Sequence, residues 1–93
     1  MKGTEKQIAY AESLRSQFIA PLQQDIETQE RLIESYRAKM EADPSRDYSA
    51  KIEMRQARIA TNQRKIAAVL AIDNAGELID AIKYGRTSLY LSE

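Results

Sequence analysis

The stretch DPSRD, residues 43–47, is the strongest turn signal in this chain of 93 residues. The residue before a proline avoids the helical region of backbone conformation, so Asp43 predicts the end of one helix. Asp43, Ser45 and Asp47 carry short oxygen-bearing side chains, each of which can cap the start of a new helix. The stretch therefore predicts a reversal of the chain between two helices.

Before this turn, apolar residues recur at intervals of three, four or seven positions, which places them along one side of a helix. They are Ile8, Ala11, Leu14, Phe18, Leu22, Ile26, Ile33, Tyr36 and Met40. We expect this helix over about residues 4–42, with Thr4 and Gln7 forming a capping box at its start. Pro21 lacks the amide that would bond to the carbonyl group of Gln17, so we expect a kink there.

After the turn, Ile52, Ile59 and Ile66 stand seven residues apart and predict a second helix over about residues 48–72. It should lie antiparallel on the first helix. We call the positions at which the two long helices face each other the seam.

Three polar residues, Gln29, Arg55 and Asn62, fall at seam positions that are normally apolar. Two interpretations stay open. Polar residues in a seam fix the register of the two helices at a cost in stability. Alternatively, this seam faces a helix of another chain, because two helices alone bury little surface.

A short third helix is expected over about residues 75–84, because Asn74 and Glu77 resemble a capping box and Gly85 ends the pattern. We expect it at the end of the hairpin opposite the turn. Its predicted contacts are Ile8, Ala11, Leu14, Phe18, Ile66, Val69 and Leu70. The tail, residues 85–93, has no helical period. The predicted fold is a single all-α domain, a long antiparallel, coiled-coil-like helical hairpin with a packed third helix.

Composition narrows the classes of function. The chain has 14 Lys and Arg against 14 Asp and Glu, and it has neither histidine nor cysteine. The commonest general base, the commonest metal ligand and the thiol nucleophile are therefore all missing. We expect no enzyme activity, no cofactor and no bound metal. No run of about 20 apolar residues predicts a membrane span, so we expect a cytoplasmic protein.

Two charged rows lie on the predicted hairpin. Glu27, Glu30 and Glu34 share a face of the first helix; carboxylate metal sites of helical bundles also need histidine, so a solvated face is the better interpretation. The second helix carries a basic stripe that phosphate groups would suit. Its residues are Lys51, Arg55, Arg58 and Lys65, with Asn62 between them.

The basic stripe has two interpretations. It binds nucleic acid, or it is neutralised by acidic residues of the first helix. In the register that we infer, Asp25 is best matched to Lys65, whereas Lys39 faces Lys51. The zero net charge removes the long-range attraction that usually brings nucleic acid to a protein.

Large and adaptable side chains gather near the turn, in a set that we call the tip. It comprises Tyr36, Arg37, Met40, Arg46, Tyr48 and Met54. Tyrosine, arginine and methionine are frequent at binding surfaces, so the tip is a candidate partner-binding site. The alternative is that Tyr36, Met40 and Tyr48 simply complete the seam.

The segment from Gly3 to Glu12, GTEKQIAYAE, resembles a motif of small helical proteins from bacteria and their phages, with a fainter echo at residues 72–74. The motif is Gly-Ser/Thr-Glu-Lys-Gln-Ile-x-aromatic-Ala-Glu. Those proteins mostly lack an assigned activity. The resemblance therefore implies a phage or mobile-element context and no particular chemistry.

Together these observations predict a non-enzymatic protein-interaction module. The resemblance suggests a phage or mobile-element accessory or inhibitor protein that binds a host protein, with an anti-defence role among the options. The alternative is a small helical nucleic-acid-associated protein that uses the basic stripe. We also expect a homodimer, because the two-helix arm buries too little surface on its own.

Overall fold

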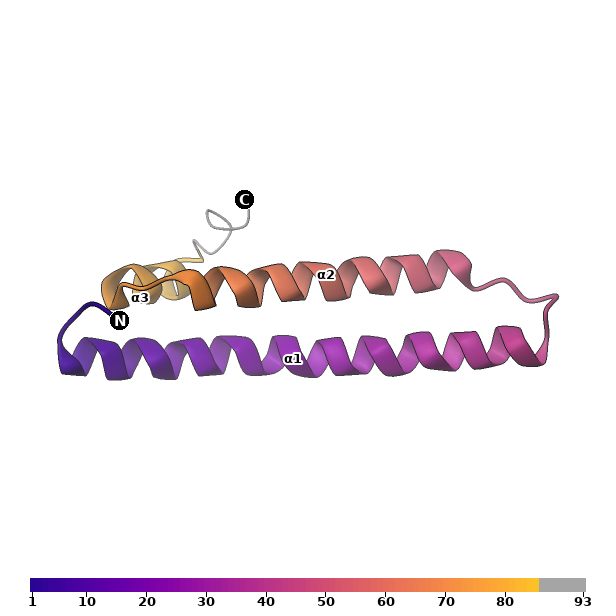
Figure 1. Ribbon diagram of the computed structural model, residues 1–93, viewed down its shortest axis with the longest axis horizontal. Coiled ribbons are helices and arrows are strands. Elements are labelled where there is room, and N and C mark those ends of the chain that lie inside the picture. The colour runs from indigo at the N-terminus through magenta and orange to yellow at the C-terminus, as the bar shows by residue number, and fades with distance from the viewer. Residues whose placement is uncertain (86–93) are drawn as a thin grey trace.

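The computed structural model describes residues 1–85 and contains helices α1 (Glu5–Ala42), α2 (Ser49–Ala71) and α3 (Ala75–Lys83). Figure 1 shows α1 and α2 as an antiparallel hairpin, with α3 at the end opposite the turn. The predicted all-α hairpin is therefore confirmed, and each helix ends within one or two residues of its expected position. The predicted tail beyond Gly85 lies outside the described residues.

Thr4 and Gln7 form the predicted capping box at the start of α1. The Gln7 amide donates to Thr4 Oγ1 at 3.2 Å, and the Thr4 amide donates to Gln7 Oε1 at 3.2 Å. Asn74 caps α3 in a similar way, since its Oδ1 accepts from the Glu77 amide at 3.1 Å. Both caps satisfy amide groups that have no partner inside their own helix.

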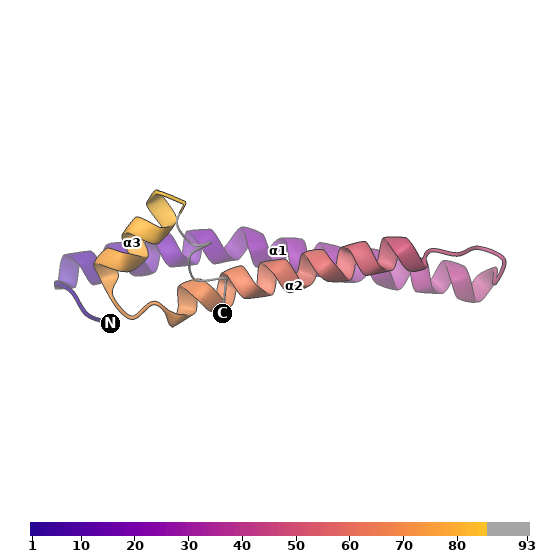
Figure 2. The same cartoon turned by 90° about the horizontal axis from the view of Figure 1, so that it is seen from above.

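α1 passes through Pro21 without interruption. Neither ribbon view shows a sharp bend at the middle of α1, in contrast to the kink that the sequence predicts (Figures 1 and 2). Pro21 and Gln17 are both exposed, so water can reach the carbonyl group that lacks its amide partner. The lost backbone hydrogen bond is one of many in this helix of 38 residues, and α1 packs against α2 and α3 along its length. These contacts keep α1 straight.

The main core lies at the three-helix end and consists of small and branched side chains. Its buried members are Ala11, Val69, Ile72, Ala75, Leu78 and Ala81. α3 packs mainly on α1, and Figure 2 shows it crossing the hairpin axis there. Ile8, Ala11, Phe18 and Val69 take part as predicted. Leu14, Ile66 and Leu70, which were also expected here, do not belong to this core, and Leu70 is 58% exposed.

The segment before α1 is bonded to the junction between α2 and α3. The Lys2 amide donates to the Asp73 carbonyl group at 2.9 Å, and the Ala75 amide donates to the Lys2 carbonyl group at 2.8 Å. The Met1 amino group lies 3.5 Å from Asp73 Oδ1. The opening motif and its echo at residues 72–74 are therefore neighbours in space, which gives both segments a structural role.

Gly3 makes this contact sterically possible. Its φ of +143° is rarely adopted by residues with a side chain, and a Cβ atom there would lie 3.0 Å from the Ala75 Cβ atom. A larger residue would push the opening segment away from α3. The glycine of the motif is thus explained by backbone packing.

We predict that Gly3→Ala lowers the free energy of unfolding by about 1–2 kcal/mol, because it combines backbone strain with a steric conflict at Ala75. Thermal unfolding followed by circular dichroism measures this. Lys2→Ala is the control, since it keeps both backbone hydrogen bonds and should unfold like the wild type. Equal stability of all three proteins would contradict the packing role of Gly3.

We predict that Pro21→Ala raises the free energy of unfolding by about 1–2 kcal/mol and does not lower helicity. The substitution restores a backbone hydrogen bond, and the gain is reduced by the greater freedom of the unfolded chain. Far-ultraviolet circular dichroism and urea unfolding measure both quantities. A loss of stability would contradict the view that Pro21 only removes one backbone hydrogen bond from α1.

Candidate functional site

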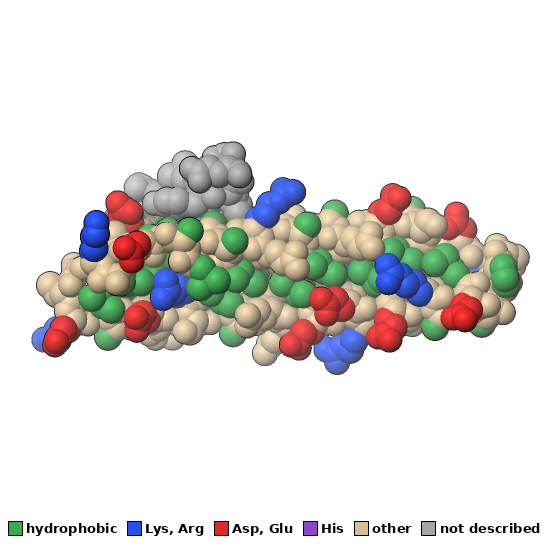
Figure 3. All heavy atoms as spheres, viewed as in Figure 1, with side chains coloured by type: hydrophobic (Ala, Val, Ile, Leu, Met, Phe, Trp, Pro, Cys, Tyr) green, Lys and Arg blue, Asp and Glu red, His purple; other side chains and the backbone are tan. Residues whose placement is uncertain are grey.

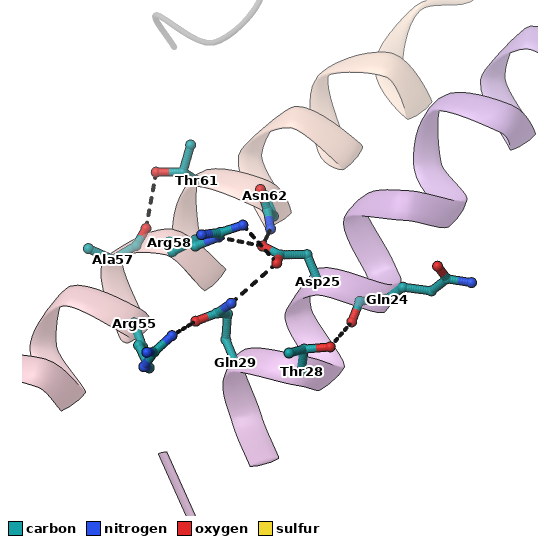
Figure 4. A network of polar contacts seen from close by, with 9 residues as sticks. All are labelled: Gln24, Asp25, Thr28, Gln29, Arg55, Ala57, Arg58, Thr61 and Asn62. Carbon is teal, nitrogen blue, oxygen red and sulfur yellow. Dashed lines mark hydrogen bonds and ion pairs between the residues drawn. The ribbon is translucent and has the colours of Figure 1, made fainter. Parts of the chain in front are cut away.

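A network of polar side chains joins α1 to α2 around Asp25 (Figure 4). Arg58 donates to the Asp25 carboxylate twice, from Nε to Oδ2 at 2.7 Å and from Nη2 to Oδ1 at 2.9 Å. Asn62 Nδ2 donates to Oδ2 at 2.7 Å, and Gln29 Nε2 donates to Oδ1 at 3.2 Å. One carboxylate thus accepts hydrogen bonds from both long helices.

The network continues through Gln29 toward the turn. Gln29 Oε1 accepts from Arg55 Nη1 at 2.7 Å. Arg55 Nη2 donates to the Tyr36 hydroxyl group at 3.4 Å, and its guanidinium carbon lies 5.6 Å from the centre of the Tyr36 ring. Gln29 and Asn62 are buried, with 3% and 6% of their surfaces exposed.

The polar seam residues are therefore bonded within the chain. Gln29 on α1 accepts a hydrogen bond from Arg55 on α2, and Asn62 on α2 donates one to Asp25 on α1. This arrangement favours the first interpretation of the sequence, in which polar residues fix the register of the hairpin. A helix of another chain that approached this side of the seam would have to compete with these internal hydrogen bonds.

The predicted pairing of Asp25 with Lys65 is wrong. Asp25 is paired with Arg58, two helical turns nearer the hairpin turn, and no side-chain hydrogen bond or ion pair joins it to Lys65 within residues 1–85. The planar guanidinium group of Arg58 matches both oxygens of a carboxylate, which the single ammonium group of Lys65 does not do.

The four residues of the predicted basic stripe do not form one free row. Arg58 is bound to Asp25, and Arg55 lies in the seam against Gln29 and Tyr36. The Lys51 ammonium group lies 5.9 Å from the centre of the Tyr36 ring and 5.7 Å from that of Tyr48. Lys65 lies at the edge of a shallow hollow beside Asp25 and Arg58 and is half-buried.

The hydrogen bonds change the pKa values of two groups in this network. Arg58 lowers the pKa of Asp25 below its ordinary value; burial opposes this shift, and Asn62 and Gln29 add to it. The hydrogen bond from Arg55 similarly lowers the pKa of the Tyr36 hydroxyl group. In both cases the hydrogen bonds and the nearby positive charge stabilise the negatively charged form of the group, which lowers its pKa.

At the tip, the structure brings Tyr36, Met40, Arg46 and Tyr48 together. The rings of Tyr36 and Tyr48 are stacked, with centres 5.1 Å apart, and the Tyr48 amide donates to Met40 Sδ at 3.4 Å. Arg46 Nε lies 3.3 Å from Asp43 Oδ2, and Arg46 Nη1 donates to the Tyr48 hydroxyl group at 3.4 Å. These contacts close the hairpin, as the alternative interpretation of the tip requires.

The two remaining tip residues lie apart from this cluster. Arg37 is exposed and borders a hollow with Ile33 and Ile59, on the side of the hairpin that Asp25 does not occupy. Met54 is 62% exposed and borders neither that hollow nor a second hollow between α1 and α2, which is lined by Ile26, Ile66 and Leu70. The six predicted tip residues therefore do not form one surface.

The sequence interpretation missed an open groove along the other side of the seam. Two adjoining hollows, with volumes of about 560 and 390 Å³, share Glu30 and together make the feature that we call the apolar groove. Its apolar lining is Ile26, Ile33, Ile59, Ile66, Ala67 and Leu70, and its polar lining is Gln23, Glu27, Glu30, Glu34, Arg37, Gln56 and Gln63. Figure 3 shows this face, with hydrophobic side chains gathered in a band between α1 and α2.

The two edges of the apolar groove differ in charge. The α1 edge carries Glu27, Glu30 and Glu34, which we call the acidic rim, and Figure 3 shows acidic side chains along α1 on this face. Within the described part of the chain, no ion pair or side-chain hydrogen bond holds these three carboxylates. The α2 edge carries the uncharged residues Gln56 and Gln63.

Comparison of the chain with known protein families, with curated proteins and with solved structures finds no significant match. Among residues 1–85, no three acidic side chains come close enough together to hold a metal ion. None of the described helices has the length and apolar character needed to cross a membrane. The network and the apolar groove are therefore the features of the molecule that bear on its function.

We predict that the stability advantage of the wild type over Asp25→Asn decreases in acid. The folded-state pKa of Asp25 lies below its unfolded value, near 3.8, so its contribution is complete above that pH and is lost as pH falls through the folded-state pKa. Urea unfolding between about pH 7 and about pH 2 measures the difference.

Glu27→Gln is the matched control, because it removes a carboxylate that has no side-chain partner within residues 1–85. Asp43 and Asp47 have lowered pKa values through their bonds to Ser45 and Ser49, so both variants still lose some stability in acid. A constant difference between wild type and Asp25→Asn across the whole pH range would contradict the assigned role of Asp25.

Proposed function

We propose that this chain is a non-enzymatic protein-interaction module that binds its partner along the apolar groove. The observation that carries the proposal is the row of isoleucine side chains left partly open between two long helices. Ile26, Ile59 and Ile66 are only half-buried, and Leu70 at the end of the row is 58% exposed. Exposed apolar side chains that lie together in a groove with polar edges are a candidate surface for another protein to cover.

The position of the groove supports a binding role for it. The polar network occupies one side of the seam, where its side chains bond to each other. On the other side, the floor is apolar and the edges are exposed over several helical turns. The free energy available from covering this floor is about 25 cal/mol for each Å² of apolar surface removed from water.

The tip supports the proposal less well than the groove does. Tyr36, Met40 and Tyr48 contact each other, and Arg46 is bound to Asp43 and Tyr48. Arg37 faces the groove and not the turn, so a contribution of Arg37 to binding would count for the groove.

Nucleic-acid binding, the alternative from the sequence, is not favoured by a specific observation. Arg55 and Arg58, the centre of the basic stripe, donate their hydrogen bonds to Gln29 and Asp25. A phosphate contact would have to compete with these bonds, and the chain has no net positive charge to attract nucleic acid.

The biological setting that we propose is an accessory or inhibitor protein of a phage or mobile element that acts on a host protein in the cytoplasm. The opening motif is its support, and the motif also has the structural role described above for Gly3 and Thr4.

We predict that a photo-crosslinking residue at position 70 captures a partner chain in cells and that the same residue at position 54 does not. Leu70 and Met54 are both on α2 and are similarly exposed, at 58% and 62%, but only Leu70 lines the groove. Denaturing gels and mass spectrometry identify the adducts. Equal capture at both positions, or capture at position 54 alone, would contradict the proposed binding surface.

A further inference from the structure

We propose that the apolar groove binds an amphipathic helix of another protein, and that this helix carries a row of basic residues along the edge that meets α1. The inference rests on the proposed function and adds the chemistry of the partner. Its supports are the shape of the groove and the unequal charges of its two edges.

The shape suits a helix. The floor is built from residues seven positions apart on each long helix, Ile26 with Ile33 on α1 and Ile59 with Ile66 on α2. A third helix lying between two antiparallel helices presents its own apolar residues to such a floor at the same spacing. Both walls are continuous helices here, and the two hollows between Leu70 and Arg37 adjoin at Glu30.

The charges select one kind of helix. The acidic rim, Glu27, Glu30 and Glu34, borders the α1 edge, and its carboxylates have no ion pair within residues 1–85. Arg31 lies beside these carboxylates but does not line the apolar groove. Lysine or arginine on the bound helix would meet the rim, as residues flanking the apolar seam do in helical pairs.

The opposite edge makes no such demand. Gln56, Gln63 and Ala67 are uncharged, so the partner helix can carry any polar residue there. Arg37 is the one base that lines the apolar groove among the described residues, and it lies at the end nearer the turn. The basic row of the partner therefore matches the stretch from Glu27 to Glu34 and ends before Arg37.

A second copy of this chain fits the charges less well. If the two grooves faced each other with α1 against α1, the two acidic rims would repel. If α1 faced α2, each acidic rim would meet only Gln56, Gln63 and Ala67. The cations Arg58 and Lys65 border a hollow that also contains Asp25, on the other side of the seam. Self-association through this groove thus offers the three carboxylates of each rim only one groove-lining cation, Arg37 of the other copy, whereas a basic helix supplies a row of countercharges.

The test uses two synthetic helical peptides of equal length. Both carry the same leucine and isoleucine residues at heptad positions; one has lysine along one edge, and the other has glutamate at the same places. Their dissociation constants for the full chain are measured by fluorescence anisotropy. We expect the lysine peptide to bind at least tenfold more tightly, which corresponds to about 1.4 kcal/mol.

The variant E27K/E30K/E34K should reverse this preference. The matched control is E12K/E41K/E53K, which makes the same change of charge at three exposed glutamates that do not border the groove. The control should keep the preference for the lysine peptide, although its altered net charge will weaken that preference slightly at low salt. Circular dichroism confirms that each variant remains helical.

Three results would overturn the inference. Equal binding of both peptides, lost in Leu70→Gln, would show a docking groove without charge selection. In the second result, neither peptide binds, and sedimentation equilibrium shows a dimer that Leu70→Gln dissociates. The occupant of the groove would then be a second copy of this chain, in line with the homodimer expected from the sequence. Failure of both peptides with a monomer would reject a basic helix as the partner, while crosslinking at position 70 would still decide the proposed function.

Discussion

The carboxylate of Asp25 is the point on which the arrangement of the two long helices depends. It accepts hydrogen bonds from Arg58 and Asn62 on α2 and from Gln29 on its own helix. A slip of one helix along the other by a turn would separate Asp25 from Asn62 and leave buried polar groups unpaired. Such groups cost more free energy than their bonds contribute, so the network selects one register among several that the isoleucine heptads alone would allow.

The same constraint divides the hairpin into two different sides. Polar side chains on the Asp25 side bond to each other, with Arg55 Nε the one buried side-chain atom left without a hydrogen-bond partner among residues 1–85, while isoleucine side chains dominate the other side. α3 covers the seam only at the end where Ala11, Leu78 and Ala81 pack together. Farther along the seam Ile33 is buried between α1 and α2, whereas Ile26, Ile59 and Ile66 are only half-buried, so the register of the two helices sets which isoleucine side chains remain accessible for the proposed binding.

Much of the fold follows from local signals. The Asp43–Asp47 turn, the Thr4 cap and the heptad isoleucines predict the elements, because capping and periodicity act within a few residues. Heptad positions show which residues approach the seam, but not to which side of it each turns. The sequence therefore did not predict the groove, and it assigned Asp25 to Lys65, since the reach and planar shape of Arg58 matter only once the helices are placed in three dimensions.

The central claim is that one side of the seam is closed by its own hydrogen bonds and the other is the binding surface. The most direct measurement is isoleucine methyl NMR of the full chain during titration with the lysine peptide. The account predicts that the methyl signals of Ile26, Ile33, Ile59 and Ile66 shift, while those of Ile8 and Ile72 near α3 remain in place. Shifts confined to Ile8 and Ile72, or binding of the peptide without a shift of Ile26, Ile59 and Ile66, would contradict it.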